Sequence, residues 1–225
     1  MKALFRKPHM DVYRHLAFAV VGGFFASYAI LCRMGVMANA QTMNLAELVL
    51  NALSGDGHGV LLHLGALAVY VFGTMLTVLL PHLLGLDPRH ASPVISGMSA
   101  IVLALIPEQA PTMLALYPIF FAMSFQWSSF SGADGYISST IFSTNNTKQT
   151  SLALAEYLCH RDPAQLRRAR LYALTLLCFH VGVTLAFLTV RQWGITASLT
   201  ILPLTLWCYI LVLCEDHSLQ AVIAA

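Results

Sequence analysis

The chain has 225 residues, of which 58% are hydrophobic and only 10% are charged, whereas an ordinary soluble domain is about 25% charged. Its mean hydropathy is +0.72. A chain of this length cannot bury so much apolar surface in a soluble core, so we expect a bilayer to surround part of it. The net charge of +2 comes without a basic patch interleaved with aromatic residues and without a glycine-rich phosphate loop. Nucleic-acid and nucleotide binding are therefore not expected.

Six apolar runs reach or approach the length of a membrane span, which is about 20 residues and at least about 17. They are Leu16–Cys32, Val60–Leu80, Ser92–Ile106, Pro111–Phe130, Leu171–Val190 and Ile195–Leu213. The third run is short and is bounded by Pro93 and Pro107. These runs predict an all-α integral membrane protein with six transmembrane helices.

The N-terminal region also has features of a signal peptide. Basic residues precede the first apolar run, and Ala38-Asn-Ala40 after it resembles a cleavage site. However, further spans follow, and the Ala-x-Ala sequence lies in a polar segment, Ala38–Asn44, whose Thr-x-Asn pattern recurs in the second half. We call each copy of this segment a polar phrase. We therefore interpret the first run as an uncleaved span.

The distribution of basic side chains predicts the orientation of the spans. With six spans, ten of the twelve Lys and Arg residues fall on one side of the membrane, and only Arg33 and Arg191 fall outside this group. Because basic loops stay in the cytoplasm, we expect a protein of the bacterial cytoplasmic membrane with Met1 and Ala225 both cytoplasmic. An eight-span arrangement sorts the charges almost equally well and remains an alternative.

A polar phrase containing Thr-x-Asn follows the first span of each half. The first copy, Ala38–Asn44, contains Thr42 and Asn44, and the second copy, Thr140–Asn146, contains Thr144 and Asn146. With three spans per half, the second half enters the membrane upside down. We therefore predict two inverted three-span repeats, residues 1–110 and 111–225, forming one membrane domain, as in many transporters. Eight spans would instead give parallel four-helix repeats.

The repeat extends weakly into the following span. Tyr70-x-x-Gly73 aligns with Phe179-x-x-Gly182, and small residues at these positions allow helices to approach closely. An alternative alignment matches His63-x-Gly65 with His180-x-Gly182. The sequence does not separate the two.

Four segments carry a resemblance to a known family: Gly22–Tyr28, Asn39–Asn44, Ala122–Gln126 and Thr144–Asn146. In this order they resemble the YoaK-like family of bacterial membrane proteins over nearly the whole chain. The resemblance implies a multi-spanning membrane fold without a defined activity. The chain departs from the family pattern at Ala26, where an Asp is frequent, and at Met43 and Asn145, where glycine is typical. The fourth-span motif also departs, being Met123–Trp127 here. These departures bear on whether a family-wide ligand, especially a cation, is retained.

Each phrase leads into a short helical pattern, so we expect a short discontinuous helix after the first span of each half. In the first, Asn44-Leu-Ala-Glu47 resembles a capping box. Irregular chain at membrane depth persists only inside protein or beside a watery cavity, and helix starts attract polar ligands. We therefore predict a substrate site between the phrases. Its candidate residues are Asn39, Gln41, Thr42, Asn44, Gln126, Thr144 and Asn146. The alternatives are capped surface loops and, for Gln126, a structural hydrogen bond between helices.

Ionisable residues inside membrane spans are functional candidates. His180, near the centre of the fifth span, and His63 are candidates for proton coupling, although a neighbouring carbonyl is enough to satisfy a neutral histidine. Glu47 and Lys148 occupy neighbouring positions when the phrases are superposed, which suggests an ion pair beside the site. The alternative is that both face water at opposite membrane surfaces.

These features predict a transporter or permease for a small polar solute. A non-transporting membrane partner or accessory subunit is the main alternative. A membrane enzyme is disfavoured because the acidic residues are scattered and show no catalytic or metal constellation. The five cysteines show no CxxC pair, so we expect reduced structural thiols, no metal and no cofactor. The expected partners are lipid, the solute and, through small-residue faces, a second copy in a homodimer.

Overall fold

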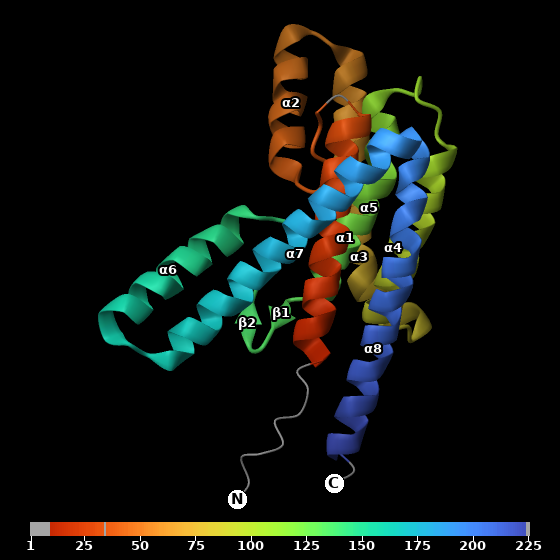
Figure 1. The fold of residues 1–225 in the computed structure, drawn as a ribbon. Helices are drawn as coiled ribbons and strands as arrows, with labels where there is room; N and C mark the ends of the chain where they lie inside the picture. The colour runs from red at the N-terminus through yellow and green to blue at the C-terminus, as the bar shows by residue number, and fades with distance from the viewer. Residues whose placement is uncertain (1–9, 34, 224–225) are drawn as a thin grey trace, which may run out of the picture.

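The computed structural model describes residues 10–33 and 35–223 and is almost entirely helical (Figure 1). The α-helices are α1 (Met10–Cys32), α2 (Gln41–Ser54), α3 (Gly57–Leu84), α4 (Pro88–Leu105), α5 (Thr112–Ser129), α6 (Thr144–His160), α7 (Pro163–Trp193) and α8 (Leu202–Ile223). A 3-10 helix, η1 (Gly194–Ile201), joins α7 to α8, and a short antiparallel hairpin of β1 (Gly132–Ala133) and β2 (Tyr136–Ile137) precedes α6. The expected all-α class is confirmed.

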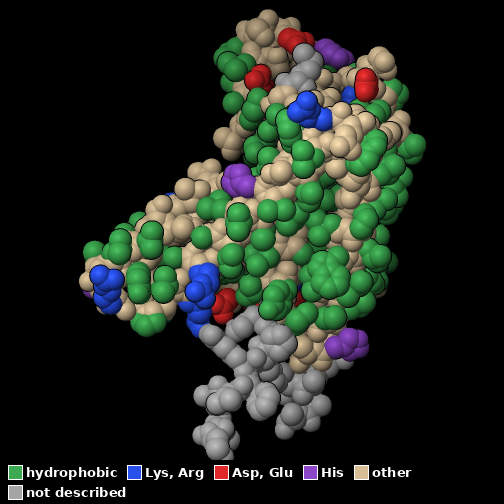
Figure 2. Space-filling view, viewed as in Figure 1, with side chains coloured by type: hydrophobic (Ala, Val, Ile, Leu, Met, Phe, Trp, Pro, Cys, Tyr) green, Lys and Arg blue, Asp and Glu red, His purple; other side chains and the backbone are tan. Residues whose placement is uncertain are grey.

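Each predicted apolar run lies in a helix, the last one being shared between η1 and α8. By length and composition, three helical segments are able to cross a membrane: α1, α3 and the continuous stretch Pro163–Ser218. Large apolar side chains are exposed along α3 and α7, and Figure 2 shows hydrophobic side chains spread over the visible face of the bundle. These features indicate association with a membrane.

The central helix α1 packs closely against α7 through two glycines. A Cβ atom on Gly23 would lie 1.8 Å from the carbonyl oxygen of Phe179, and one on Gly182 would lie 2.0 Å from that of Val20. Both distances are far below van der Waals contact, so only glycine allows this approach. The backbones of α1 and α7 therefore touch directly.

Helix α3 packs in a related way on α5. A Cβ atom on Gly73 would lie 2.2 Å from the Ser124 hydroxyl and 3.0 Å from the carbonyl oxygen of Phe121. Gly73 of α3, in the first half of the chain, thus approaches the backbone of α5, the first helix of the second half. Gly182 of α7, in the second half, approaches the backbone of α1, the first helix of the first half. The nearest atoms to Gly65 belong instead to the Tyr117 side chain. This packing favours the alignment of Gly73 with Gly182.

The two short helices predicted after the first spans are α2 and α6. Helix α2 lies at one end of the bundle beside the start of α3, and α6 forms a projecting arm with the first part of α7 (Figure 1). Helix α2 has 14 residues and is about 21 Å long, which is less than the roughly 30 Å of a hydrocarbon core. It is therefore too short to cross a bilayer alone.

The predicted capping box is wrong. Helix α2 begins at Gln41, and its N-cap residue Ala40 provides no side-chain hydrogen bond. Asn44 therefore lies inside the helix, where its side chain is buried against α3. The second short helix begins at Thr144, inside the second phrase.

A buried arginine fixes the connection between α1 and the start of α5. The Arg33 guanidinium, only 2% exposed, donates to the carbonyl oxygens of Ile106, Pro107 and Glu108 at 3.3, 3.1 and 3.0 Å. These carbonyls follow the end of α4, where a cation also meets the negative end of the helix dipole. Arg33 therefore has a structural role.

Candidate functional site

A cavity of about 290 Å³ lies between α2, α3 and the start of α5. Its lining consists of apolar side chains with a few polar groups: Val36, Met37, Met43, Asn44, Glu47, His63, Thr112, Met113 and Phe120. Convergent polar groups in an apolar pocket are typical of ligand sites. A larger hollow of about 430 Å³ is lined by residues at the start of α7 alone, and one of about 490 Å³ has only an apolar lining apart from the Tyr13 hydroxyl, the Trp207 indole N–H and the Cys178 thiol.

The polar wall of the cavity is a hydrogen-bonded pair, Asn44 and His63. The Asn44 amide nitrogen donates to the side-chain oxygen of Gln41 at 2.8 Å and to the carbonyl oxygen of His63 at 3.1 Å. Its amide oxygen lies 2.8 Å from Nδ1 of His63. This oxygen can only accept, so the neutral imidazole carries its proton on Nδ1 and keeps Nε2 as an acceptor.

Glu47 lies one turn beyond Asn44 on α2 and also lines the cavity. Its carboxylate forms no hydrogen bond or ion pair with any residue that the structure describes. The expected pair with Lys148 is not formed, because α2 and α6 extend in different directions from the two phrases (Figure 1). Lys148 is exposed on α6 and is absent from the cavity lining.

The second phrase is packed differently from the first. Asn146, 1% exposed, donates to the carbonyl oxygens of Ser139 and Phe142 at 2.6 and 3.2 Å and accepts a hydrogen bond from the Ser138 hydroxyl at 3.1 Å. Ser138 in turn lies 2.9 Å from Nε2 of the buried His15. All the hydrogen-bonding groups of the Asn146 side chain are therefore used inside the protein.

The two phrases meet through Asn39. Its amide nitrogen donates to the carbonyl oxygens of Gly22, at 2.9 Å, and Ile141, at 3.3 Å. Gln126 makes a similar joint, donating to the carbonyl oxygen of Phe18 and the hydroxyl of Thr140 at 3.2 and 2.8 Å. Both side chains are completely buried. They act as structural joints, which is the alternative that the sequence left open for Gln126.

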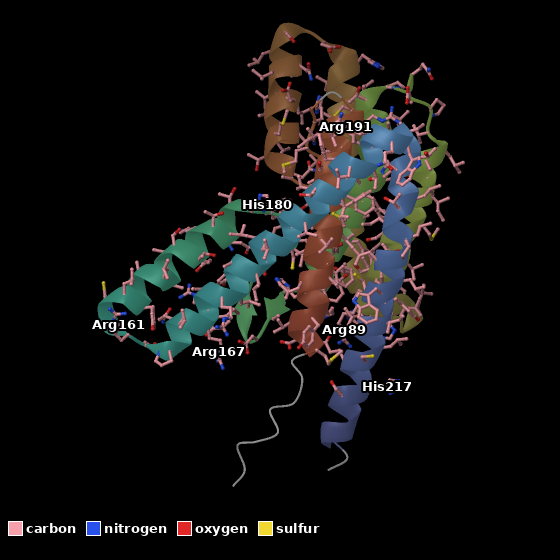
Figure 3. The ribbon with its side chains drawn as sticks, in the orientation of Figure 1. Arg89, Arg161, Arg167, His180, Arg191 and His217 are labelled. Carbon is pink, nitrogen blue, oxygen red and sulfur yellow. The ribbon has the colours of Figure 1, made fainter. Side chains whose placement is uncertain are left out.

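The remaining candidates lie outside the cavity. Thr42 and Thr144 are exposed on α2 and α6. His180 is exposed on α7, where its Nδ1 donates to the carbonyl oxygen of Leu176 at 2.7 Å (Figure 3). It is absent from the cavity lining. Of the predicted site residues, the structure thus brings Asn44 and His63 together at the cavity, with Gln41 beside them.

Residues 15–213 match the model of a protein family of unknown function, DUF1275. The chain belongs to this family. The match covers α1 from His15 onwards, most of α8 and all the residues of the cavity. It confirms the expected membership of a family without an assigned activity, although it does not extend to the YoaK name. Comparison with curated proteins and with solved structures found no match.

This DUF1275 chain also contains a charged cluster that the sequence analysis missed. At the end of the bundle opposite α2, Arg89 pairs with Asp87 at 2.6 Å and with Asp216 at 2.9 Å, and His90 lies 2.6 Å from Asp216. Hydrogen bonds from Arg89 hold the pKa of Asp87 below its ordinary value, although partial burial acts in the opposite direction. Ligand atoms of Asp87, His90 and Asp216 lie within 4.8 Å of one another. Because Arg89 of α4 pairs with both carboxylates, and Asp216 lies on α8, the cluster links α4 to α8.

Proposed function

We propose that this DUF1275 protein is a transporter or permease of the bacterial cytoplasmic membrane, with its solute site in the cavity beside α2. The observation that carries the proposal is the cavity itself, in which the Asn44–His63 pair lies with apolar side chains and with Glu47, whose carboxylate has no partner among the described residues. Such a site lies at a short discontinuous helix, as substrate sites in transporters often do.

The proposal includes six spans arranged as two inverted repeats. In support, α1 packs on α7 as α3 packs on α5, and the helices of each such pair come from different halves. Figure 1 shows α1 running upward and α5 downward. Figure 3 places Arg89, Arg161 and Arg167 toward the lower part of the molecule and Arg191 near the top, in agreement with the predicted charge sorting.

The two phrases differ in their access to a cavity, and this difference is compatible with an alternating-access mechanism. Asn44 borders an open cavity, whereas Asn146, at the equivalent position, is sealed by its own loop. Inverted-repeat transporters change access by moving one repeat against the other around a fixed site. In this proposal the structure represents a state with the first repeat open and the second closed.

A non-transporting membrane partner is the second candidate. Asn39 of the first phrase bonds directly to Ile141 of the second, and Gln126 joins Thr140 of the second phrase to Phe18 of α1. Such a packed interior suits a structural subunit. A homodimer through exposed apolar helix faces is compatible with either function.

Labelling of the loop between α2 and α3 tests the topology. With six spans, a cysteine at Asp56 is expected to react with a membrane-impermeant thiol reagent added outside intact cells, whereas one at Asp162 reacts only after permeabilisation. Eight spans place position 56 inside. Met1 and Ala225 lie outside the described residues, and reporter fusions at both ends are expected to report the cytoplasm. The observation that would remove the six-span proposal is protection of position 56 in intact cells.

Metabolite exchange tests the function. Cells lacking the protein are compared with cells restored by the wild type, by His63→Ala and by an exposed control, His160→Ala. We expect at least one small solute to differ in uptake or efflux, and the difference to be lost with His63→Ala but kept with His160→Ala. Equal solute profiles for all the strains would favour the non-transporting partner.

A further inference from the structure

The cavity beside α2 has an unbalanced charge. Glu47 is the only lining residue with a carboxylate, and the lining contains no Lys or Arg in the part of the chain that the structure describes. The sequences of α2, α3 and α5, which enclose the cavity, also contain no Lys or Arg. A ligand therefore meets a negative group without a neighbouring positive side chain.

The basic residue closest in sequence to the lining residues Val36 and Met37 bonds to another part of the protein. Arg33 precedes the loop that supplies Val36 and Met37, but its guanidinium donates to three backbone carbonyls and is 2% exposed. It is absent from the cavity lining. The Nδ1 proton of His63 is donated to Asn44, so the neutral imidazole keeps Nε2 as an acceptor. Neither group offsets the charge of Glu47.

The positive end of α2 argues for an anion, but with less weight. The exposed N–H groups at a helix start carry roughly half a unit charge, whereas the carboxylate of Glu47 carries a whole one. The cavity lining includes neither Gln41 nor Thr42 of the first turn of α2, whereas it does include Glu47. An anionic ligand is therefore disfavoured.

The walls of the cavity suit an apolar organic body. Met37, Met43 and Met113 supply adaptable, polarisable thioethers. Phe120 supplies an aromatic ring, whose face attracts cations. A bare metal ion would leave most of the 290 Å³ unfilled, and a fully polar solute would leave these walls without a partner.

We propose that this cavity binds a small organic cation with an apolar body, such as a quaternary or protonated amine, with Glu47 as its counter-ion. The proposal rests on the assignment of the transport site to this cavity and names the class of its solute. The Asn44–His63 pair orients the polar end, and the methionines with Phe120 hold the remainder.

Binding to the purified full-length protein in detergent tests the proposal with two probes of similar size and opposite charge. Benzyltrimethylammonium is expected to raise the melting temperature in a concentration-dependent way, and benzylsulfonate is not. In Glu47→Gln the apparent affinity for benzyltrimethylammonium should fall by at least about tenfold. Glu156→Gln, at an exposed acid of α6, should bind it like the wild type.

A second measurement does not depend on the Glu47 variant. In Met43→Cys, benzyltrimethylammonium is expected to slow modification of the new cysteine by a thiol reagent, and benzylsulfonate is not. Equal affinity of wild type and Glu47→Gln, or tighter binding of the sulfonate, overturns the proposal. These assays measure binding, so they separate the two proposals. If the protein binds the cation but cells show no solute exchange, the transport function is wrong and the cation site stands. If solute exchange depends on His63 but the protein does not bind the cation, the proposed class of solute is wrong and the transport function stands.

Discussion

Gly23→Ala is expected to prevent stable folding or to lower the free energy of unfolding by about 3 kcal/mol or more. The added Cβ atom would overlap the backbone carbonyl of Phe179, at 1.8 Å, and a backbone carbonyl cannot move away as a side chain can. The change therefore forces α1 and α7 apart along their whole contact. Thermal melting and size-exclusion profiles of the purified protein measure the effect.

Two further glycines provide a graded comparison. Gly182→Ala should be as harmful as Gly23→Ala, because its Cβ meets the carbonyl of Val20 at 2.0 Å. Gly73→Ala should be milder, since the closest atom is the rotatable Ser124 hydroxyl. Gly57→Ala is the control, because no atom lies within 4 Å of its added Cβ. Wild-type melting of Gly23→Ala would mean that α1 and α7 do not approach this closely.

The helices were predictable from the sequence because their signal is local. Runs of apolar residues of span length give α1, α3, α4, α5 and α7, and the polar phrases mark the two short helices. The start of α2 was misplaced, because Asn44 and Glu47 have the residue types of a capping box at the right spacing. The structure uses Asn44 for a bond to the carbonyl of His63 instead, and the sequence gives no local sign of that choice.

The site was less predictable because it depends on contacts between distant segments. Asn44 was selected as part of a polar phrase and His63 as an ionisable residue inside a span, but nothing in the sequence paired them. Met113 and Phe120 of α5 looked like ordinary apolar span residues until the fold placed them at the cavity. The pairing of Glu47 with Lys148 failed because superposing two repeats gives equivalent positions, and equivalent positions need not be neighbours.

Arg33 illustrates the same limit. In the sequence it was one of two basic residues outside the predicted cytoplasmic group. Its partners are carbonyl oxygens about 74 positions away, and backbone acceptors are present at every residue. No pattern of residue types identifies such an arginine, whereas its burial in the structure shows its role at once.

Asn44 and Asn146 each end one of the two polar phrases, and their replacement by alanine is expected to affect different properties, stability for Asn146 and ligand binding for Asn44. Asn146→Ala leaves the carbonyls of Ser139 and Phe142 without this donor and the Ser138 hydroxyl without this acceptor, in a region closed to water. Unsatisfied buried groups cost about 1 to 3 kcal/mol each. We therefore expect a loss of stability of about 3 kcal/mol or more.

Asn44→Ala should cost only about 1 kcal/mol, because its partners Gln41 and His63 are half-buried beside the cavity and water can replace the amide. It should instead weaken benzyltrimethylammonium binding and solute exchange, since His63 loses the bond that fixes its tautomer. Asn145→Ala, at an exposed position of α6, should change neither property. Melting temperatures and probe affinities of the three variants decide the matter. Equal stability losses for Asn44→Ala and Asn146→Ala would mean that the two phrases are equally closed, and the open and closed assignment of the repeats would be wrong.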